Sequence, residues 1–142
     1  MVYTQAVINE TLRLYPPAYI TSREAVRDTT IGGVSIPKGH VILISMYATH
    51  RDPRFFPEPD SFRPERWLDG LEKRLPRGAF IPFGMGSRKC IGSSFALMEA
   101  TLLLANIARR WHFELLTDEV PTHPSITLRP ATTMPALMRA VG

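Results

Sequence analysis

Thirteen prolines are spread along this chain of 142 residues, and they limit where regular structure can form. Each proline fixes φ and removes a main-chain hydrogen-bond donor, so long helices are expected only between prolines. Two stretches meet this condition and carry apolar residues at helical spacing, residues 3–14 and 93–110. Pro16 and Pro17 follow the first stretch and end it. The prolines therefore predict two helices of useful length, with short elements elsewhere.

The helix predicted over 93–110 is apolar around nearly its whole circumference. Such a helix is either buried on every side or spans a membrane. Glu99 and Asn106 interrupt the apolar run, and Arg109 and Arg110 follow it. These polar residues favour a buried core helix over a membrane span. If its neighbours belong to another part of a longer protein, this chain alone exposes that apolar surface.

Short strands are predicted on both sides of this helix. Ile31-Gly32-Gly33-Val34 is typical of a hairpin turn, and residues 41–44 are expected to form a buried strand. Further strands are predicted at 112–116, 126–129 and 137–141, where apolar residues alternate between turns. The pattern indicates a mainly α protein with small β-sheets, an α+β fold.

Residues 52–82 are rich in proline and charge and show no sustained periodicity. Composition alone leaves an ordered meander and a disordered linker about equally supported. Aromatic side chains recur through the segment, among them Phe55, Phe56, Trp67 and Phe80. A linker has no need of such anchors, so we expect an ordered meander.

Cys90 is the only cysteine, and it lies in the sequence Phe-Gly-Met-Gly-Ser-Arg-Lys-Cys-Ile-Gly over residues 83–92. A lone cysteine is more often a small buried hydrophobe than a ligand. Here Arg88 and the start of the following helix favour the thiolate, which is the form that binds metals. Gly86 and Gly92 permit a positive φ or a close approach to a flat ligand. The loop indicates an iron ligand.

Other chemistries fit these residues poorly. A cysteine phosphatase needs an arginine six positions after the nucleophile, where this chain has Ala96. Lys89 replaces the third glycine of a dinucleotide fingerprint, and no serine or threonine follows it as in a P-loop. Structural zinc needs about four ligands. The four histidines, which we interpret as ordinary, lack paired spacing: His40, His50, His112 and His123.

Three motifs together resemble those of the cytochromes P-450. The pattern F-x-x-G-x-R-x-C-x-G of that family's haem-binding loop is met at every position, by Phe83, Gly86, Arg88, Cys90 and Gly92. Glu10-Thr11-Leu12-Arg13 is similar to the family's E-x-x-R helix, and residues 62–67 resemble the segment whose arginine, here Arg66, joins that pair in a structural network. The alternative for Glu10 and Arg13 is a surface helix pair worth about 0.2–0.5 kcal/mol.

The resemblance implies haem b as cofactor, with the Cys90 thiolate as the axial iron ligand. Arg88 would then bind a haem carboxylate, and Phe83 would shield the sulfur. Arg23 is similar in placement to a propionate-binding arginine, and is equally explained as a surface charge. The resemblance also places six residues at the substrate pocket, although they could equally belong to the core: Ala18, Tyr19, Ile20, Thr21, Thr133 and Met134.

By this resemblance, residues 1–142 are the C-terminal haem-binding part of a single cytochrome P-450 domain. The implied activity is insertion of one oxygen atom from O2 into a lipophilic organic substrate. The family's acid-alcohol pair for proton delivery is not in this chain, so the chain has no catalytic residue of its own and is expected to be inactive alone. A non-catalytic haem-binding module and an inactive remnant of a truncated gene remain as alternatives.

The net charge of +4 includes a group of cations in the meander and the cysteine loop. That group consists of Lys73, Arg74, Arg77, Arg88 and Lys89. It predicts either an ordinary solvated surface or a docking face for a redox partner, a ferredoxin or a flavin reductase, beneath the sulfur. Nucleic acid is not indicated, because no aromatic residues are interleaved with these charges. No membrane segment or signal peptide is recognised, so a cytoplasmic location is expected unless the parent protein carries an upstream anchor.

Overall fold

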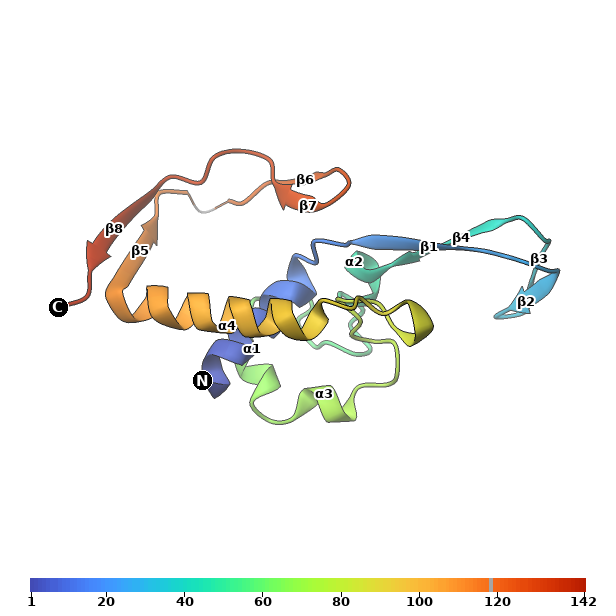
Figure 1. The fold of residues 1–142 in the computed structure, drawn as a ribbon, viewed down its shortest axis with the longest axis horizontal. Coiled ribbons are helices and arrows are strands. Elements are labelled where there is room, and N and C mark those ends of the chain that lie inside the picture. The colour runs from blue at the N-terminus through green and yellow to red at the C-terminus, as the bar shows by residue number, and fades with distance from the viewer. Residues whose placement is uncertain (118) are drawn as a thin grey trace.

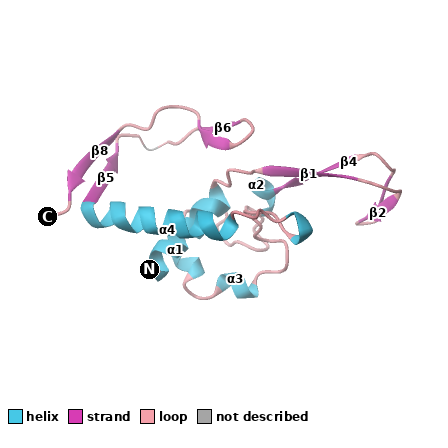
Figure 2. Ribbon diagram, in the orientation of Figure 1, coloured by secondary structure: helices cyan, strands magenta, loops and turns pink. Residues whose placement is uncertain are grey.

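The computed structural model describes residues 1–117 and 119–142. Its helices are α1 (Val2–Leu14), α2 (Met46–Thr49), α3 (Leu71–Arg74) and α4 (Ser93–Arg110), with 3-10 helices η1 (Pro64–Trp67) and η2 (Gly86–Arg88). Its strands are β1 (Ile20–Glu24), β2 (Thr29–Ile31), β3 (Val34–Ile36), β4 (Val41–Ser45), β5 (Trp111–Leu115), β6 (Thr122–Pro124), β7 (Leu128–Pro130) and β8 (Ala136–Ala140). The structure mixes helices with small sheets, which agrees with the α+β fold predicted from the sequence (Figures 1 and 2).

The strands pair as separate two-stranded antiparallel sheets: β1 with β4, β2 with β3, β5 with β8, and β6 with β7. The predicted hairpin is present, because Ile31 pairs with Val34 around Gly32 and Gly33. Both glycines have positive φ, +57° and +83°, as a two-residue hairpin turn of this hand requires. The strand predicted at 126–129 is shorter and lies later, at Leu128–Pro130.

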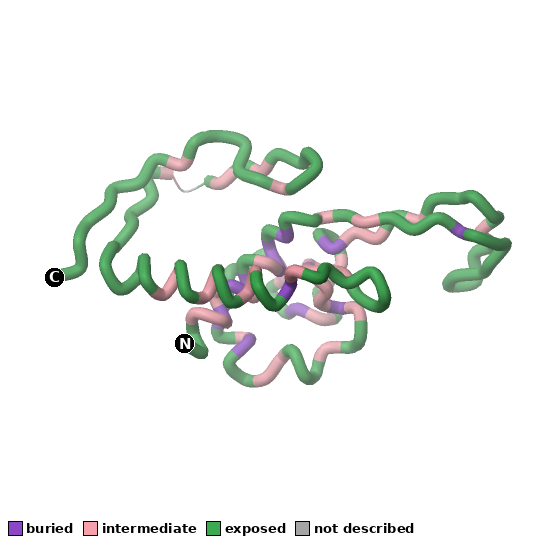
Figure 3. The backbone as a smooth tube through the Cα atoms, viewed as in Figure 1, coloured by how far each residue is buried: buried purple, intermediate pink, exposed green. Residues whose placement is uncertain are grey.

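The core lies where α1, η1 and the meander meet (Figure 3). Ala6, Phe56 and Trp67 form its buried centre, and the half-buried Phe55, Leu71, Leu75 and Phe80 pack around them. The aromatic residues expected to anchor the meander therefore do so. Residues 52–82 form an ordered segment, as predicted.

Burial elsewhere is lower than the sequence indicates. β4 forms over the predicted residues, but Val41 is 62% exposed and Leu43 is 66% exposed, so the expected buried strand is wrong. Ile42 and Ile44, which point to the opposite face, are half-buried, so this two-stranded sheet is partly covered on one face only.

α4 has the predicted bounds, but Ser93 is its only buried residue among those described, at 7% exposure. Large apolar side chains lie exposed along it, including Phe95, Met98 and Leu103. The chain exposes 10198 Å² in total, whereas a compact monomer of 16.0 kDa exposes about 7,400 Å². The apolar surface of α4 is therefore open in this chain, as expected if the neighbours of this helix belong to another part of a longer protein. No helix in the described residues has the length and apolarity to cross a membrane.

Candidate functional site: the buried ion network and the cysteine loop

Glu10 and Arg13 lie on one face of α1, and neither side chain has any exposed surface. Arg13 makes a bidentate ion pair with Glu10, because its Nε donates to Oε2 and its Nη2 donates to Oε1, both at 2.9 Å. The interpretation of this pair as a weak surface contact is therefore wrong. A fully buried pair of charges needs further hydrogen bonds to offset its lost hydration.

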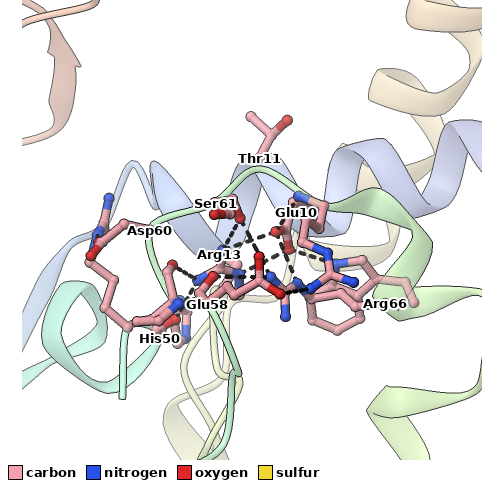
Figure 4. Close-up of polar contacts among 12 residues, drawn as sticks. Glu10, Thr11, Arg13, His50, Glu58, Asp60, Ser61 and Arg66 are labelled. Carbon is pink, nitrogen blue, oxygen red and sulfur yellow. Dashed lines mark hydrogen bonds and ion pairs between the residues drawn. The ribbon is translucent and has the colours of Figure 1, made fainter. Parts of the chain in front are cut away.

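The segment that follows the core phenylalanines supplies those bonds to Glu10. Arg66 Nε donates to Oε1 at 3.1 Å, the Arg63 amide donates to Oε1 at 2.8 Å, and Trp67 Nε1 donates to Oε2 at 2.9 Å (Figure 4). Burial alone raises the pKa of Glu10, but the bonds from Arg13, the Arg63 amide and Trp67, together with the Arg13 charge, hold it below its ordinary value. The carboxylate is therefore held in its charged form.

Arg13 also ties the meander to α1 through main-chain carbonyl groups. Its Nη1 donates to the carbonyl oxygens of His50 at 2.9 Å and Pro59 at 2.5 Å, and its Nη2 donates to that of Ser61 at 3.1 Å. A guanidinium has five donors in a fixed plane, which suits this number of partners. One side chain thus joins α1, α2 and the start of the meander (Figure 4).

His50, interpreted from the sequence as an ordinary histidine, is fully buried beside this network. Its Nε2 accepts a hydrogen bond from the Ile81 amide at 2.9 Å, and its ring packs on Phe80 with centroids 5.1 Å apart. Neither contact has a sequence signal, because both join residues about thirty positions apart. No sequence pattern therefore predicts the link between the network and the segment that leads into the cysteine loop.

The cysteine loop runs from Phe83, which is half-buried, to Gly92 at the start of α4. Gly86 begins η2 with a φ of +72°, a backbone conformation that residues other than glycine rarely adopt. The loop then returns on itself, because the Cys90 amide donates to the Phe83 carbonyl oxygen at 2.9 Å. A Cβ atom added to Gly92 would lie 3.9 Å from Cys90 Sγ, an ordinary van der Waals distance, so Gly92 lies directly beside the sulfur.

The surroundings of Cys90 suit a flat apolar group with its own metal ligands. The described residues contain no cluster of three or more His, Cys, Asp or Glu side chains that could hold a bare ion. Cys90 is exposed, as are the neighbouring Ile91 and Phe95, at 104% and 63% of full exposure. Arg88 is exposed on the same loop and offers a cation for a carboxylate. An iron porphyrin fits this donor set, since it needs one protein sulfur and an apolar surface.

The remaining predicted residues lie elsewhere. Arg23 is exposed on β1, where its Nη1 donates to the Ser22 carbonyl oxygen at 2.7 Å. Tyr19 donates to the Ser125 carbonyl oxygen at 2.9 Å, which joins the stretch before β1 to the turn before β7. Ala18, Ile20 and Thr133 are exposed, whereas Thr21 and Met134 are half-buried. The structure gives this group no shared contact with the cysteine loop among the hydrogen bonds of the described residues.

A cavity of about 500 Å³ lies between α1, α3, the cysteine loop and the start of α4. Its lining includes Arg77 from the meander, Lys89 from the cysteine loop and Glu72 from α3. The meander and the loop therefore meet at this cavity through Arg77 and Lys89, whereas the other cations predicted for the same face, Lys73, Arg74 and Arg88, do not line it. Two of its three charged lining residues are cations.

Comparisons with known proteins agree with the three motifs. The profile of the family described as Cytochrome P450 matches residues 1–137. Cyclooctatin synthase of Streptomyces melanosporofaciens is 52% identical over 111 residues, which cover 78% of this chain and 24% of that protein. Cyclooctat-9-en-7-ol 5-monooxygenase of the same organism is 50% identical over 109 residues, covering 77% and 24%. Cytochrome P450 3A1 of Rattus norvegicus is 44% identical over 114 residues, covering 80% and 23%.

Solved structures agree on the fold. Cyanobacterial CYP120A1 with bound retinoic acid superposes with a TM-score of 0.91 at 31% identity, covering 98% of this chain and 32% of that one. The cytochrome P450DA heme domain superposes with a TM-score of 0.89 at 30% identity, covering 98% and 31%. This chain spans about a quarter of the length of the curated relatives it matches. It corresponds to a C-terminal portion of their fold, and it belongs to the cytochrome P450 family.

Proposed function

We propose that this chain is the haem-binding part of a haem-thiolate monooxygenase, with Cys90 as the axial ligand of haem b. The observation that carries the proposal is the exposed Cys90 sulfur, which lies beside exposed apolar side chains on a loop closed by the bond from the Cys90 amide to the Phe83 carbonyl. Membership of the family supports a haem cofactor in general. When bound, an iron porphyrin with a thiolate ligand supplies the cleavage of the oxygen-oxygen bond and the oxidation of the substrate.

The residues of the loop hold and orient the group in this proposal. Arg88 pairs with a haem carboxylate, and Phe83 keeps water from the sulfur. Gly86 supports the turn with its positive φ, and Gly92 lies directly beside the sulfur. Arg23 is proposed as a second carboxylate partner, which requires its guanidinium to leave the Ser22 carbonyl.

Glu10, Arg13 and Arg66 are proposed as a brace that holds the meander and performs no chemistry. Residues 1–142 are proposed to be part of one cytochrome P450 domain, and the chain alone is expected to show no turnover. The substrate class is a lipophilic organic molecule, which the names of two relatives support, a cyclooctat-9-en-7-ol 5-monooxygenase and a P450 with bound retinoic acid. The pocket is proposed to include residues 18–21 together with Thr133 and Met134.

Absorbance spectra of the chain with added hemin test the ligand. After reduction and addition of carbon monoxide, we expect the red-shifted band of a thiolate-ligated haem, and we expect Cys90→Ser to abolish it, because a serine hydroxyl is not a soft anionic ligand. A double variant, Cys90→Ser with Ser87→Cys, is the matched control, since it keeps one loop thiol at the wrong position. This control is also expected to lack the band.

The same spectra separate the alternatives. A band in the wild type that survives Cys90→Ser would remove Cys90 as the ligand. No band in the wild type would favour the inactive remnant of a truncated gene. A band without turnover, once the chain is joined to the missing part of a relative's domain, would favour a non-catalytic haem-binding module.

The proposed redox partner is an acidic ferredoxin or flavin reductase that docks on the cations of the meander and cysteine loop. Arg77 and Lys89 line one cavity beside Glu72, which supports a common location for at least these two cations. Reversing two neighbouring charges on α3, with Lys73→Glu and Arg74→Glu, is expected to slow reduction of the haem-loaded chain about tenfold at low salt, because steering by charge sets the rate of encounter. Stopped-flow reduction by ferredoxin measures this rate. Arg129→Glu on β7 is the control, and an equal rate for both variants would contradict docking at α3.

A further inference from the structure

His50 contacts both the ion network and the segment that leads into the cysteine loop. Its side chain has no exposed surface. Its carbonyl oxygen accepts a hydrogen bond from Arg13 Nη1 at 2.9 Å, and its ring Nε2 accepts one from the Ile81 amide at 2.9 Å. A single buried residue therefore joins α1 to the residues just before Phe83.

The hydrogen bond from the Ile81 amide determines which nitrogen of the His50 ring carries the proton. A backbone amide only donates, so Nε2 must present a lone pair to Ile81, and the neutral ring carries its proton on Nδ1. A second proton would place one N–H group against another. Nδ1 is buried and makes no hydrogen bond of ordinary geometry among the described residues, although the main-chain carbonyl groups of Leu12 and Arg13 lie close enough to favour a proton on the ring. The bond to Ile81 therefore exists only while the ring is neutral.

Main-chain hydrogen bonds extend this contact to the cysteine. The Gly84 amide donates to the Ile81 carbonyl oxygen at 2.9 Å, and the Cys90 amide donates to the Phe83 carbonyl oxygen at 2.9 Å. Ile81 is therefore connected through Gly84 and Phe83 to the turn that carries Cys90.

The ring of His50 is also linked to the network through aromatic packing. It lies 5.1 Å from Phe80, which lies 4.6 Å from Trp67, and Trp67 Nε1 donates to Glu10 Oε2 at 2.9 Å. This path returns to the carboxylate that pairs with Arg13. His50 is therefore linked to the Glu10–Arg13 pair twice, through its main-chain carbonyl group and through the packing of its ring.

The charged groups around His50 oppose a second proton on its ring. Arg13 on α1 faces it, and Arg51 follows it in sequence and pairs with Asp60 at 3.4 Å. Burial lowers the pKa of His50 to about 4, and the positive charges of Arg13 and Arg51 lower it as well. The main-chain carbonyl groups of Leu12 and Arg13 raise this pKa, but they do not offset the effect of burial. The ring is therefore neutral at physiological pH.

We propose that His50 is a positioning residue, whose neutral ring holds the Ile81 amide and so fixes the start of the cysteine loop against the Glu10–Arg13 pair. Protonation of the ring in acid releases this hold. The proposal concerns the position of the loop and does not depend on the ligand that Cys90 binds. Its failure would therefore leave the proposed function untouched.

Nuclear magnetic resonance of the full 15N-labelled chain, without hemin, tests the proposal. We expect the imidazole of His50 to show the Nδ1–H tautomer at neutral pH and to titrate with a midpoint near 4 instead of the ordinary 6.5. The amide signals of Ile81, Gly84 and Cys90 are expected to shift with the same midpoint. An Nε2–H tautomer, a midpoint near 6.5, or amides that do not follow the ring would overturn the proposal.

Variants separate positioning from simple packing. His50→Gln keeps a side-chain acceptor, so the Ile81 amide is expected to remain hydrogen-bonded and to lose its acid titration. His50→Leu keeps the volume without an acceptor, so the signals of Ile81 and Cys90 are expected to move at neutral pH. If His50→Leu does not fold, the titrations of the wild type and of His50→Gln still test whether the ring holds the Ile81 amide. His123→Gln, a change in β6, is expected to leave the Ile81 titration as in the wild type, and an altered titration there would count against His50.

Discussion

Replacing Glu10 with glutamine is expected to destabilise the chain by about 3 to 5 kcal/mol, although the two side chains have nearly the same shape. The substitution leaves the Arg13 guanidinium buried without a counter-charge. In the wild type both carboxylate oxygens of Glu10 accept hydrogen bonds, from Arg13, Arg66 and Trp67. The glutamine NH2 group would replace one of these oxygens and would face the N–H donors of these side chains. A buried charge or donor without a partner costs far more than the average hydrogen bond contributes.

Urea denaturation followed by far-ultraviolet circular dichroism measures this loss. Glu114→Gln is the matched control, because Glu114 also pairs with an arginine, Arg139 at 3.3 Å, but both side chains are more than half exposed. An exposed pair contributes less than about 1 kcal/mol, so this control should unfold almost as the wild type does. Equal midpoints for the two variants would mean that the buried network does not stabilise the fold.

The contrast between these two pairs also explains what the sequence could predict. The spacing of Glu10 and Arg13 predicts that they meet on one helix face, and they do. Their burial depends on residues 50–67 folding across α1, and no local pattern encodes the path of such an irregular segment. Trp67 was expected only to anchor the meander, and its hydrogen bond to Glu10 was not predicted.

Local patterns predict the positions of the regular elements well but say less about how far each element is buried in this chain. The prolines and apolar spacing predict α1 and α4, and the paired glycines predict the β2–β3 hairpin. Apolar composition also predicts burial for β4 and α4, where the structure exposes them. Composition reports which surfaces need covering, whereas burial depends on neighbours. This chain spans about a quarter of its curated relatives, so such neighbours need not lie within it.

The residues of the candidate site also differ in how far the sequence predicts them. A short motif was enough to single out Cys90, because the turn, the nearby cation and the start of the helix all lie within ten residues. His50 carries no such pattern, since its partners Arg13 and Ile81 are distant in sequence. Contacts of that kind follow from tertiary structure alone, which is why His50 was interpreted as ordinary.

Acid is expected to destabilise the chain in two steps, and the first belongs to His50. In the unfolded chain this histidine binds a proton as the pH falls through 6.5, whereas in the folded chain burial and the charges of Arg13 and Arg51 delay binding until about pH 4. Between these values the unfolded state holds more protons, so stability falls as the pH falls. The loss is about 1.4 kcal/mol per pH unit and is on the order of 3 kcal/mol near pH 4.

The second step belongs to Glu10, whose pKa in the folded chain lies below the ordinary value of 4.5. Its stabilising effect is therefore lost only as the pH falls below 4.5. Urea midpoints measured from pH 7.5 to pH 3.5 therefore separate the two groups. His50→Gln removes the titrating ring and is expected to flatten the curve between pH 6.5 and 4.5 while keeping the fall below it. His123→Gln, which removes an exposed histidine, should reproduce the wild-type curve. A wild-type curve that stays flat down to pH 4.5 would show that His50 takes up its proton equally in the folded and unfolded states, and hence that burial does not keep the ring neutral.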